Sequence, residues 1–258
     1  MKMTTARAYA RVGLLGNPSD MYGGKCISFT FDKKAEVEIN DSLEIRIEGN
    51  GIVERDLKYN GRHDLVKAVL NKMKPNLLGR GIRIRYKSDI PVGAGLAGSS
   101  AIVIAMLRAL GEYVNFPLDN YQTAEIGTYT EVDELGIAAG FQDRYVISFQ
   151  GVCYMDFKGK ELMRKTDNHG SVEKLDVDDI PCFLILSGKP KESATVHNPL
   201  RERFLHGRIE DREYIKSTMD GIASIAESGR QYILDRNWEE VGKLMNRNHE
   251  LRRDIGLS

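Results

Sequence analysis

Three patterns in the 258-residue sequence predict an α+β fold. Residues 82–87 alternate apolar and basic side chains with a period of two, which is typical of a strand with one buried face. Residues 102–110 form an apolar run that is too long for most strands and indicates a buried helix. Further on, the apolar residues 182–186 predict a strand that is followed only by helix-like stretches.

The first 160 residues contain most of the predicted strands. Apolar and polar residues alternate in these stretches, and clusters of glycine, proline and asparagine separate them. Strands are predicted over 6–15, 27–31, 35–39, 43–47, 82–87 and 151–157. Helices are predicted over 63–73, 102–110, 119–135 and 141–149. Pro75 ends the first of these helices, and Asp119 begins the third.

The polar stretch 158–180 is the predicted domain boundary. It separates a domain at 1–160 from a second domain at 178–258. In the second domain, the apolar strand precedes three predicted helices, at about 198–206, 211–235 and 237–252.

The charge balance argues against binding to nucleic acid. Lys plus Arg and Asp plus Glu each total 37, so the formal net charge is zero, whereas a nucleic-acid footprint needs an excess of basic residues. A zero net charge is still compatible with a local basic pocket for a small anion.

The sequence predicts a cytoplasmic protein that does not bind membranes. Residues 1–10 lack the apolar core of a signal peptide, and no uninterrupted apolar run approaches membrane-spanning length. The cysteines, Cys26, Cys153 and Cys182, are odd in number and widely spaced. Such cysteines indicate unreactive thiols in a reducing compartment rather than disulfides or a zinc site.

The densest motif is the glycine-rich stretch 90–101, between the predicted strand and the buried helix. Its glycines allow positive φ angles and a close approach of backbone N–H groups to a ligand. The first N–H groups of the following helix have no partner within it, and the helix dipole adds partial positive charge. These features favour a phosphate-binding loop. The alternative is a tight turn in which Ser99 and Ser100 only cap the helix.

Residues 91–101 resemble the phosphate loop of the GHMP kinases, the superfamily of galactokinase, homoserine kinase, mevalonate kinase and phosphomevalonate kinase. The usual loop reads Pro-x-x-x-Gly-Leu-Gly-Ser-Ser-Ala, and this chain has one extra residue, Ala97. Glucuronokinases have the same longer form. The resemblance implies a two-domain GHMP-kinase-like fold, with a ribosomal protein S5 domain 2-like N-terminal domain and a ferredoxin-like C-terminal domain. It also implies that ATP binds at Pro91, Gly93, Ala94, Gly95, Leu96, Ala97, Gly98, Ser99, Ser100 and Ala101.

The resemblance to glucuronokinases extends from about Arg7 to Arg253. It includes the stretches 16–22, 134–144, 196–205 and 244–253. It implies that the γ-phosphoryl of ATP is transferred, with Mg²⁺, to the anomeric hydroxyl of D-glucuronate. The alternatives are a kinase for another sugar or a mevalonate-like alcohol, and a nucleotide-binding relative without turnover.

A second cluster, 136–144, contains the candidate catalytic residue Asp143. From the sequence alone, a helix cap and a catalytic carboxylate are equally good interpretations of an acidic residue after a glycine break. In GHMP kinases, a glycine-containing loop at about this distance from the phosphate loop carries the catalytic Asp. The resemblance therefore implies that Asp143 accepts or orients the proton of the substrate hydroxyl.

The candidate metal ligands are Ser100 and Glu131. Helical spacing brings Glu131 and Glu134 near one face, where a solvated acidic surface is the simpler interpretation of either residue. Family members bind Mg²⁺ through a Glu on this helix and the second serine of the phosphate loop. The resemblance implies Glu131, with Glu134 as the alternative, and a hard cation with few protein oxygens suits Mg²⁺.

Residues 7–25 contain the candidate sugar-binding loop. Arg11 matches a basic residue on the family's first strand, which implies that it stabilises charge on the phosphoryl group and keeps Asp143 ionised. The alternative is a basic residue on the surface of a strand. Asn17, Asp20 and Tyr22 are the implied sugar ligands. Galactokinases have Gly-Glu-His-Thr-Asp where this chain has Gly-Asn-Pro-Ser-Asp, which argues against galactose.

Three basic residues further along could contact a substrate carboxylate: His197, Arg201 and Arg203. An Arg fork suits this contact. For each residue taken singly, a helix-start histidine or a solvated arginine is the favoured interpretation.

GHMP kinases have a third glycine-rich motif in the C-terminal domain, and none occurs after residue 230. The strand 182–186 has no predicted neighbour, and the predicted helix 211–235 needs a sheet face to cover. The chain is therefore expected to be truncated at its C-terminus and incompletely folded in its second domain.

Overall fold

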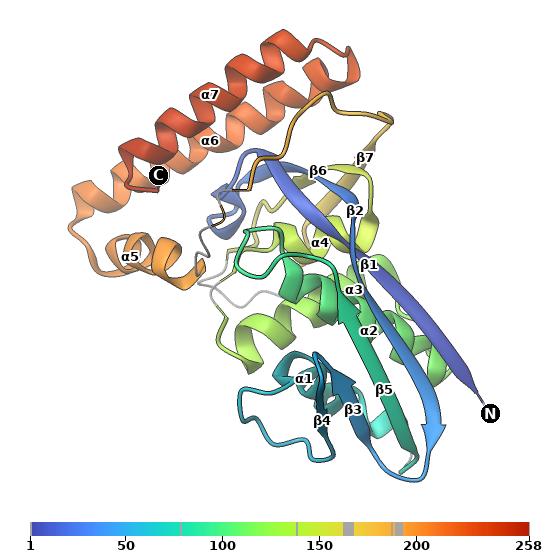
Figure 1. Ribbon diagram of the computed structural model, residues 1–258. Coiled ribbons are helices and arrows are strands. Elements are labelled where there is room, and N and C mark those ends of the chain that lie inside the picture. The colour runs from blue at the N-terminus through green and yellow to red at the C-terminus, as the bar shows by residue number, and fades with distance from the viewer. Residues whose placement is uncertain are drawn as a thin grey trace. The chain divides into compact units, whose positions relative to one another are not determined.

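The computed structural model describes residues 2–77, 79–137, 139–161, 168–186, 188 and 193–257. Strands and helices are mixed along the chain, which confirms the predicted α+β class (Figure 1). The chain divides into two compact units: Met1–Ala10 with Phe31–Ile137, and Arg11–Thr30 with Ala138–Ser258. These units are defined by contacts within the chain. The boundary predicted at 158–180 refers to the two domains of the kinase family and stays a prediction.

Two long strands, β1 (Met3–Leu15) and β2 (Lys25–Ser42), pass from one unit into the other. They pair with each other. The predicted strands 27–31 and 35–39 are therefore one continuous strand. Because β2 is long, its two halves pair with different strands: Ala35–Ser42 pairs with β5, and Lys25–Phe29 pairs with β6.

In the first unit, the strand order is β4-β3-β5-β2. Here β5 (Gly81–Ser88) runs antiparallel to β2 and parallel to β3 (Arg46–Gly49), and β3 pairs with the short β4 (Ile52–Glu54). The register aligns Ile39, Ile84 and Ile47 on one buried face.

The opposite face of this sheet is charged. Arg83 donates two hydrogen bonds of 2.9 Å to Glu48, and Arg85 pairs with Glu38 at 3.1 Å. The period of two that predicted the strand at 82–87 is thus confirmed: alternate residues contact the core and an ion-pair ladder. Such exposed pairs contribute little to stability, because water and salt screen them.

Helices of the first unit carry the apolar residues that cover the isoleucine face. α2 (Gly98–Tyr113) is buried along most of its length, as its apolar run predicts. α1 (Asp64–Met73) is followed by a 3₁₀ turn over Lys74–Leu77. α3 (Asn120–Thr128) begins at a capping box between Asp119 and Gln122 and continues into the π-helix η3 (Tyr129–Glu134). The range predicted as one helix, 119–135, therefore contains an α-helix followed by a π-helix.

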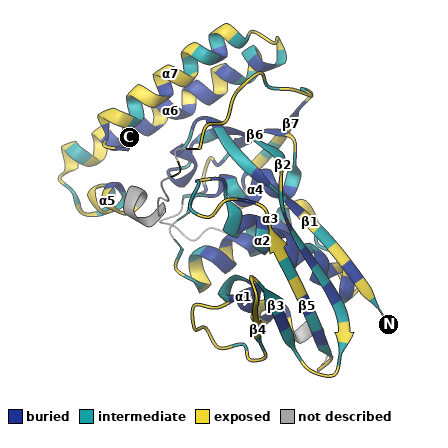
Figure 2. Ribbon diagram, in the orientation of Figure 1, coloured by how far each residue is buried: buried dark blue, intermediate teal, exposed yellow. Residues whose placement is uncertain are grey.

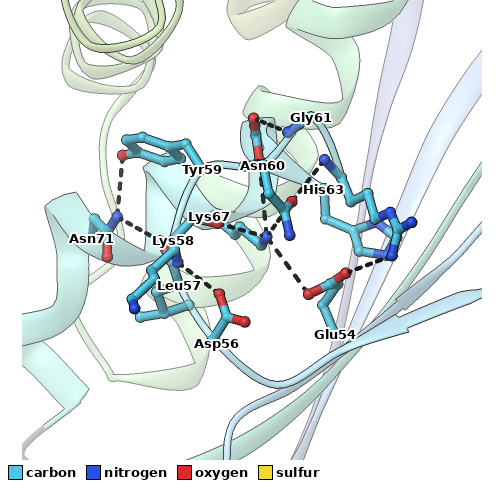
Figure 3. A network of polar contacts seen from close by, with 12 residues as sticks. Glu54, Asp56, Leu57, Lys58, Tyr59, Asn60, Gly61, His63, Lys67 and Asn71 are labelled. Atoms are coloured by element: carbon cyan, nitrogen blue, oxygen red, sulfur yellow. Dashed lines mark hydrogen bonds and ion pairs between the residues drawn. The ribbon is translucent and has the colours of Figure 1, made fainter.

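A buried lysine fixes the loop between β4 and α1 (Figure 3). Lys67 is inaccessible to solvent, and its Nζ donates to the Lys58 carbonyl at 2.8 Å and to Asn60 Oδ1 at 2.9 Å. Glu54 Oε2 and Asp64 Oδ1 both lie 3.9 Å from Nζ. Because a buried ammonium group must be hydrogen-bonded and paired, this network holds the loop against α1.

The second unit contains the rest of the regular structure. Its strands follow the order β2-β6-β7, with β6 (Val152–Asp156) antiparallel to both neighbours and β7 (Ser171–Leu175) at the edge. The helices are α4 (Gln142–Phe149), α5 (Ser193–His206), α6 (Ile209–Leu234) and α7 (Trp238–Asp254). α6 and α7 lie side by side, with exposed residues on their outer faces (Figure 2).

The predicted strand 182–186 is wrong. These residues have no regular secondary structure, and Phe183 and Ile185 are 99% and 87% exposed. A strand needs a hydrogen-bonded neighbour, and none pairs with this stretch within the part of the chain that the structure describes. The strands β4 and β7 were not predicted, because β4 has only three residues and β7 is mostly polar.

The expectation that the helix 211–235 lacks a sheet face is also wrong. In α6, Ile225 and Ile233 pack in one cluster with Leu15, Ile27 and Val152, which belong to β1, β2 and β6. Its earlier turns pack in a second cluster that contains Met21, Tyr22, Leu200, Ile215, Met219 and Ile222. The long N-terminal strands supply the apolar face that the sequence pattern of residues 178–258 did not contain.

The cysteines are all free thiols, and Cys26 and Cys153 are buried. Burial raises the pKa of Cys153 to about 12 and raises that of Cys26 well above its ordinary value. Both are therefore unreactive, as predicted. Among the described residues, no helix is long and apolar enough to cross a membrane.

Candidate active site

The phosphate loop joins β5 to α2 and has three residues in the left-handed region. These are Gly93, Gly95 and Ala97, with φ angles of 69°, 72° and 57°. Ala97 is the N-cap of α2 and makes no side-chain cap hydrogen bond. The loop is partly or fully exposed except at Leu96. The start of α2 is therefore a helix N-terminus without a side-chain cap, the kind of site that can receive an anion.

Ser100 and Glu131 meet in the first unit. The Ser100 hydroxyl donates to Glu131 Oε2 at 2.6 Å, and both side chains are buried. Ser100 is thus engaged with a carboxylate and not with the helix start. Glu131 lies in the π-helical turn, an irregularity that is frequent at functional sites.

Glu134 lies elsewhere. It is exposed, and its carboxylate accepts a hydrogen bond from the Tyr59 hydroxyl at 2.6 Å. The structure therefore brings Glu131, and not the alternative Glu134, to Ser100. A buried hydroxyl and carboxylate are hard oxygen donors of the kind that Mg²⁺ prefers. No group of three or more His, Cys, Asp or Glu side chains suited to a metal occurs among the described residues, so most ligands would come from phosphates and water.

Arg11 and Asp143 form an ion pair in the second unit. Arg11 Nε and Nη2 lie 2.7 Å and 2.6 Å from Asp143 Oδ1. The two side chains are 12% and 13% exposed, so the pair is largely shielded but can still be reached. Arg11 comes from β1, and Asp143 lies in the first turn of α4. A guanidinium so close to the carboxylate fixes the orientation of the Asp143 side chain.

The loop at residues 16–24 brings Asp20 close enough to this pair for both charges to act on it. The Asn17–Pro18 peptide bond is cis, and Asp20 lies in the short 3₁₀ turn that follows. Asp20 is completely buried, and it accepts hydrogen bonds from the Gln142 N–H at 3.0 Å and from Gln142 Nε2 at 3.2 Å. Burial, and then the nearby Asp143 carboxylate, raise the pKa of Asp20.

The other two predicted sugar ligands lie at the same loop. The Asn17 carbonyl accepts a hydrogen bond from Asn248 Nδ2 at 3.3 Å, and the Asn17 side chain is partly exposed. Tyr22 is buried edge-on against Phe204, with ring centroids 5.0 Å apart. Burial raises the pKa of the Tyr22 phenol to about 12, so it is a neutral hydroxyl at ordinary pH.

The three candidate carboxylate-binding residues differ in their surroundings. Arg203 forms an ion pair with Asp211 at 2.7 Å and donates to the Ile255 carbonyl at 3.2 Å, so it has a structural role. The side chain of His197 lies outside the described part of the chain. Arg201 is partly buried, makes no hydrogen bond or ion pair with any described residue, and acts electrostatically on Tyr22.

Sequence reasoning missed Ser28 and Gln142, which belong to the same polar cluster as Asp20. The Ser28 hydroxyl donates to Gln142 Oε1 at 2.8 Å. Nothing in the sequence distinguishes Ser28 from other strand serines. Gln142 could have been found only as the neighbour of Asp143.

Comparisons with known proteins indicate the family of the chain. Residues 64–151 match the family model described as GHMP kinases N terminal domain. A relative named probable glucuronokinase 2, from Arabidopsis thaliana, is 35% identical over 274 residues, which span 96% of this chain and 73% of the relative. Glucuronokinase 1 of the same plant is 34% identical over 271 residues, with the same coverage. A solved D-glycero-D-manno-heptose 1-phosphate kinase from Bacteriodes thetaiotaomicron has a TM-score of 0.73 at 22% identity, covering 98% of this chain and 79% of that one.

The fold and these relatives define a class of small-molecule kinase, and the chain belongs to the GHMP kinase family. It is a phosphotransferase with an alcohol group as acceptor, and within that class it is a sugar kinase.

Proposed function

We propose that the protein transfers the γ-phosphoryl group of ATP to the anomeric hydroxyl of D-glucuronate, giving glucuronate 1-phosphate and ADP. The observation that carries the choice of substrate is the identity of about 35% with two glucuronokinases across 96% of the chain. The Arg11–Asp143 pair supports the chemistry, because it combines a base with a phosphate-compatible cation.

In the proposed reaction, Asp143 Oδ accepts the proton of the anomeric hydroxyl as that oxygen attacks the γ-phosphorus. The bond from the γ-phosphorus to the bridging oxygen breaks, and ADP leaves with the bond's electron pair. Arg11 holds the Asp143 carboxylate in place before the attack and offsets negative charge on the phosphoryl group. General-base catalysis of this kind is worth about 10²–10⁴ in rate.

The phosphates of ATP are proposed to bind at the start of α2. The N–H groups of its first turn and the positive end of its dipole would hold the anion, and the loop residues 91–97 would close around it. Ser100 and Glu131 would hold the Mg²⁺ ion, which would neutralise charge between the phosphates.

Arg201 is the proposed partner of the glucuronate carboxylate. Of His197, Arg201 and Arg203, it is the one whose side chain is described and which is not already ion-paired. Its charge also acts on Tyr22, a candidate sugar ligand. A guanidinium can bind a carboxylate through two parallel hydrogen bonds. Asn17 and Tyr22 are the proposed contacts of the sugar hydroxyls.

The test is ADP release measured with glucuronate, glucose, galactose and mevalonate as acceptors. We expect glucuronate to have the highest kcat/KM, because a guanidinium left unpaired by a neutral sugar penalises that sugar. Arg201→Met should lower kcat/KM for glucuronate by about 100-fold and leave that for glucose nearly unchanged. Arg212→Met, at an exposed position of α6, is the matched control. Equal kcat/KM for glucuronate and glucose in the wild type would leave only the kinase class.

A further inference from the structure

Helix α4, which carries Asp143, has no cap in its own sequence. Its N-cap residue is Phe141, whose side chain cannot accept a hydrogen bond, and no side-chain cap is formed there. The first N–H groups of a helix have no partner within the helix. At α4, the N–H of Gln142 donates instead to Asp20, 122 residues earlier in the chain.

The Asp20 carboxylate holds Gln142 at two points. One oxygen accepts the backbone N–H at 3.0 Å, and the other accepts side-chain Nε2 at 3.2 Å. The remaining polar atom of that side chain, Oε1, accepts from the Ser28 hydroxyl on β2. All three side chains are buried, so this network excludes water and fixes the orientation of Gln142.

The glycine at 140 makes room for this arrangement. A Cβ atom added at Gly140 would overlap Asp20 Oδ2. The glycine is therefore required by the close approach of the carboxylate, and its φ angle is not in the left-handed region. A side chain at 140 would push Asp20 away from the Gln142 N–H without removing any polar group.

Asp143 directly follows Gln142, and its carboxylate contacts Arg11. We infer that Asp20 is a positioning residue for Asp143: it caps α4 from outside the helix and fixes the turn from which the catalytic carboxylate projects. The inference rests on the proposed role of Asp143 as base. It differs from the sugar-ligand role that the sequence implies for Asp20, because the carboxylate is completely buried and both of its oxygens accept hydrogen bonds from Gln142.

A carboxylate suits this position better than an amide. Only a carboxylate offers two acceptor oxygens, one for each Gln142 donor, and negative charge is favourable at a helix start. Asp20→Asn has nearly the same shape but must turn its NH₂ group towards one of the two donors. The variant therefore loosens the first turn of α4 without creating a cavity.

The experiment compares steady-state kinetics of Asp20→Asn and Gly140→Ala, using the acceptor that the wild type phosphorylates fastest. Each variant should lower kcat by about 10- to 100-fold, the range expected when a catalytic group is misplaced by up to an ångström. KM for the acceptor and for ATP should stay within threefold. The double variant should be no slower than the slower single variant, because both changes break the same contact. Gly242→Ala, at an open position in α7, is the matched control and should leave kcat unchanged.

Two outcomes overturn the inference. A rise in acceptor KM with kcat retained in Asp20→Asn would make Asp20 a direct sugar ligand. An unchanged kcat in folded Gly140→Ala would show that the Asp20 contact does not matter. If Asp20→Asn does not fold, the kcat of Gly140→Ala still tests the inference, because that variant retains the Asp20 charge and both Gln142 donors. Asp143→Asn measured alongside separates the two proposals: activity near the wild type there would refute the base itself, whereas loss there with normal Asp20→Asn would refute only the positioning role.

Discussion

The starts of α2 and α4 are both loop-to-helix junctions with a glycine nearby, but they are completed in opposite ways. At α2, the side chain of the N-cap Ala97 offers no acceptor, and the preceding loop is partly exposed. At α4, the N-cap Phe141 offers none either, but the buried carboxylate of Asp20 accepts the first N–H group.

The two junctions use the unpaired N–H groups of a helix start in two different ways. An N-terminus whose N–H groups face solvent can bind the phosphate of a ligand. An N-terminus occupied by a protein carboxylate cannot, but it gains a fixed orientation, and its first-turn side chain can be placed accurately. The proposed reaction needs both, because one junction would bind and release the nucleotide while the other would hold the base in place.

Replacing the base should give the largest effect. Asp143→Asn should lower kcat by about 10²–10⁴ because the amide cannot accept the proton. Binding of a non-hydrolysable ATP analogue, measured by calorimetry, should change less than threefold, since the α2 junction is intact. A variant with reduced analogue affinity and normal kcat would reverse the roles assigned to the two junctions.

The metal pair tests the α2 side of the comparison. Ser100→Ala removes a proposed hard oxygen ligand of Mg²⁺. It should therefore raise the Mg²⁺ concentration for half-maximal rate by roughly tenfold, the lower end of what a disturbed metal shell costs. Ser99→Ala is the control, since it is the Ser100 hydroxyl that donates to the Glu131 carboxylate. If both variants show the wild-type Mg²⁺ dependence, Ser100 has a structural role only.

The Asp20 carboxylate at the start of α4 should make the stability of the protein depend on pH. The pKa of Asp20 is raised, so the folded state holds this proton more tightly than the unfolded state does. The Asp20 contribution to wild-type stability is present below pH of about 4 and is lost as the pH rises through the raised pKa. Asp20→Asn cannot titrate there, so its free energy of unfolding should improve relative to wild type between pH 4 and 7. Urea unfolding across this range measures the difference, and a flat difference would contradict it.

The smallest effect concerns backbone strain at the open junction. Ala97 has a φ of 57°, and the left-handed region costs an alanine about 1–2 kcal/mol. Ala97→Gly removes this strain but adds unfolded-state entropy, so the net stabilisation should be about 0.5 kcal/mol. Ala94→Gly, where φ is not positive, should destabilise instead. Urea unfolding of both variants distinguishes them, and equal shifts would mean that Ala97 is unstrained.

The sequence by itself determined the local features. The strand at 82–87, the glycine loop and the buried helix after it are contiguous, and each follows from periodicity or backbone chemistry within about ten residues. The motif resemblance of this stretch also indicated the kinase family. The resemblance also implied that Glu131 acts together with Ser100, with Glu134, one turn away, as the alternative.

Only the tertiary structure decided the second polar site and the partners of the C-terminal helices. Arg11, Asp20, Ser28 and Gln142 come from separate segments, and their hydrogen bonds depend on how β1, β2 and α4 pack together. The same long strands bury α6, whereas the strongly apolar residues 182–186 form no strand. Hydrophobicity and spacing specify what a segment can become, but pairing and capping need a second segment, and its position is set by the fold of the whole chain.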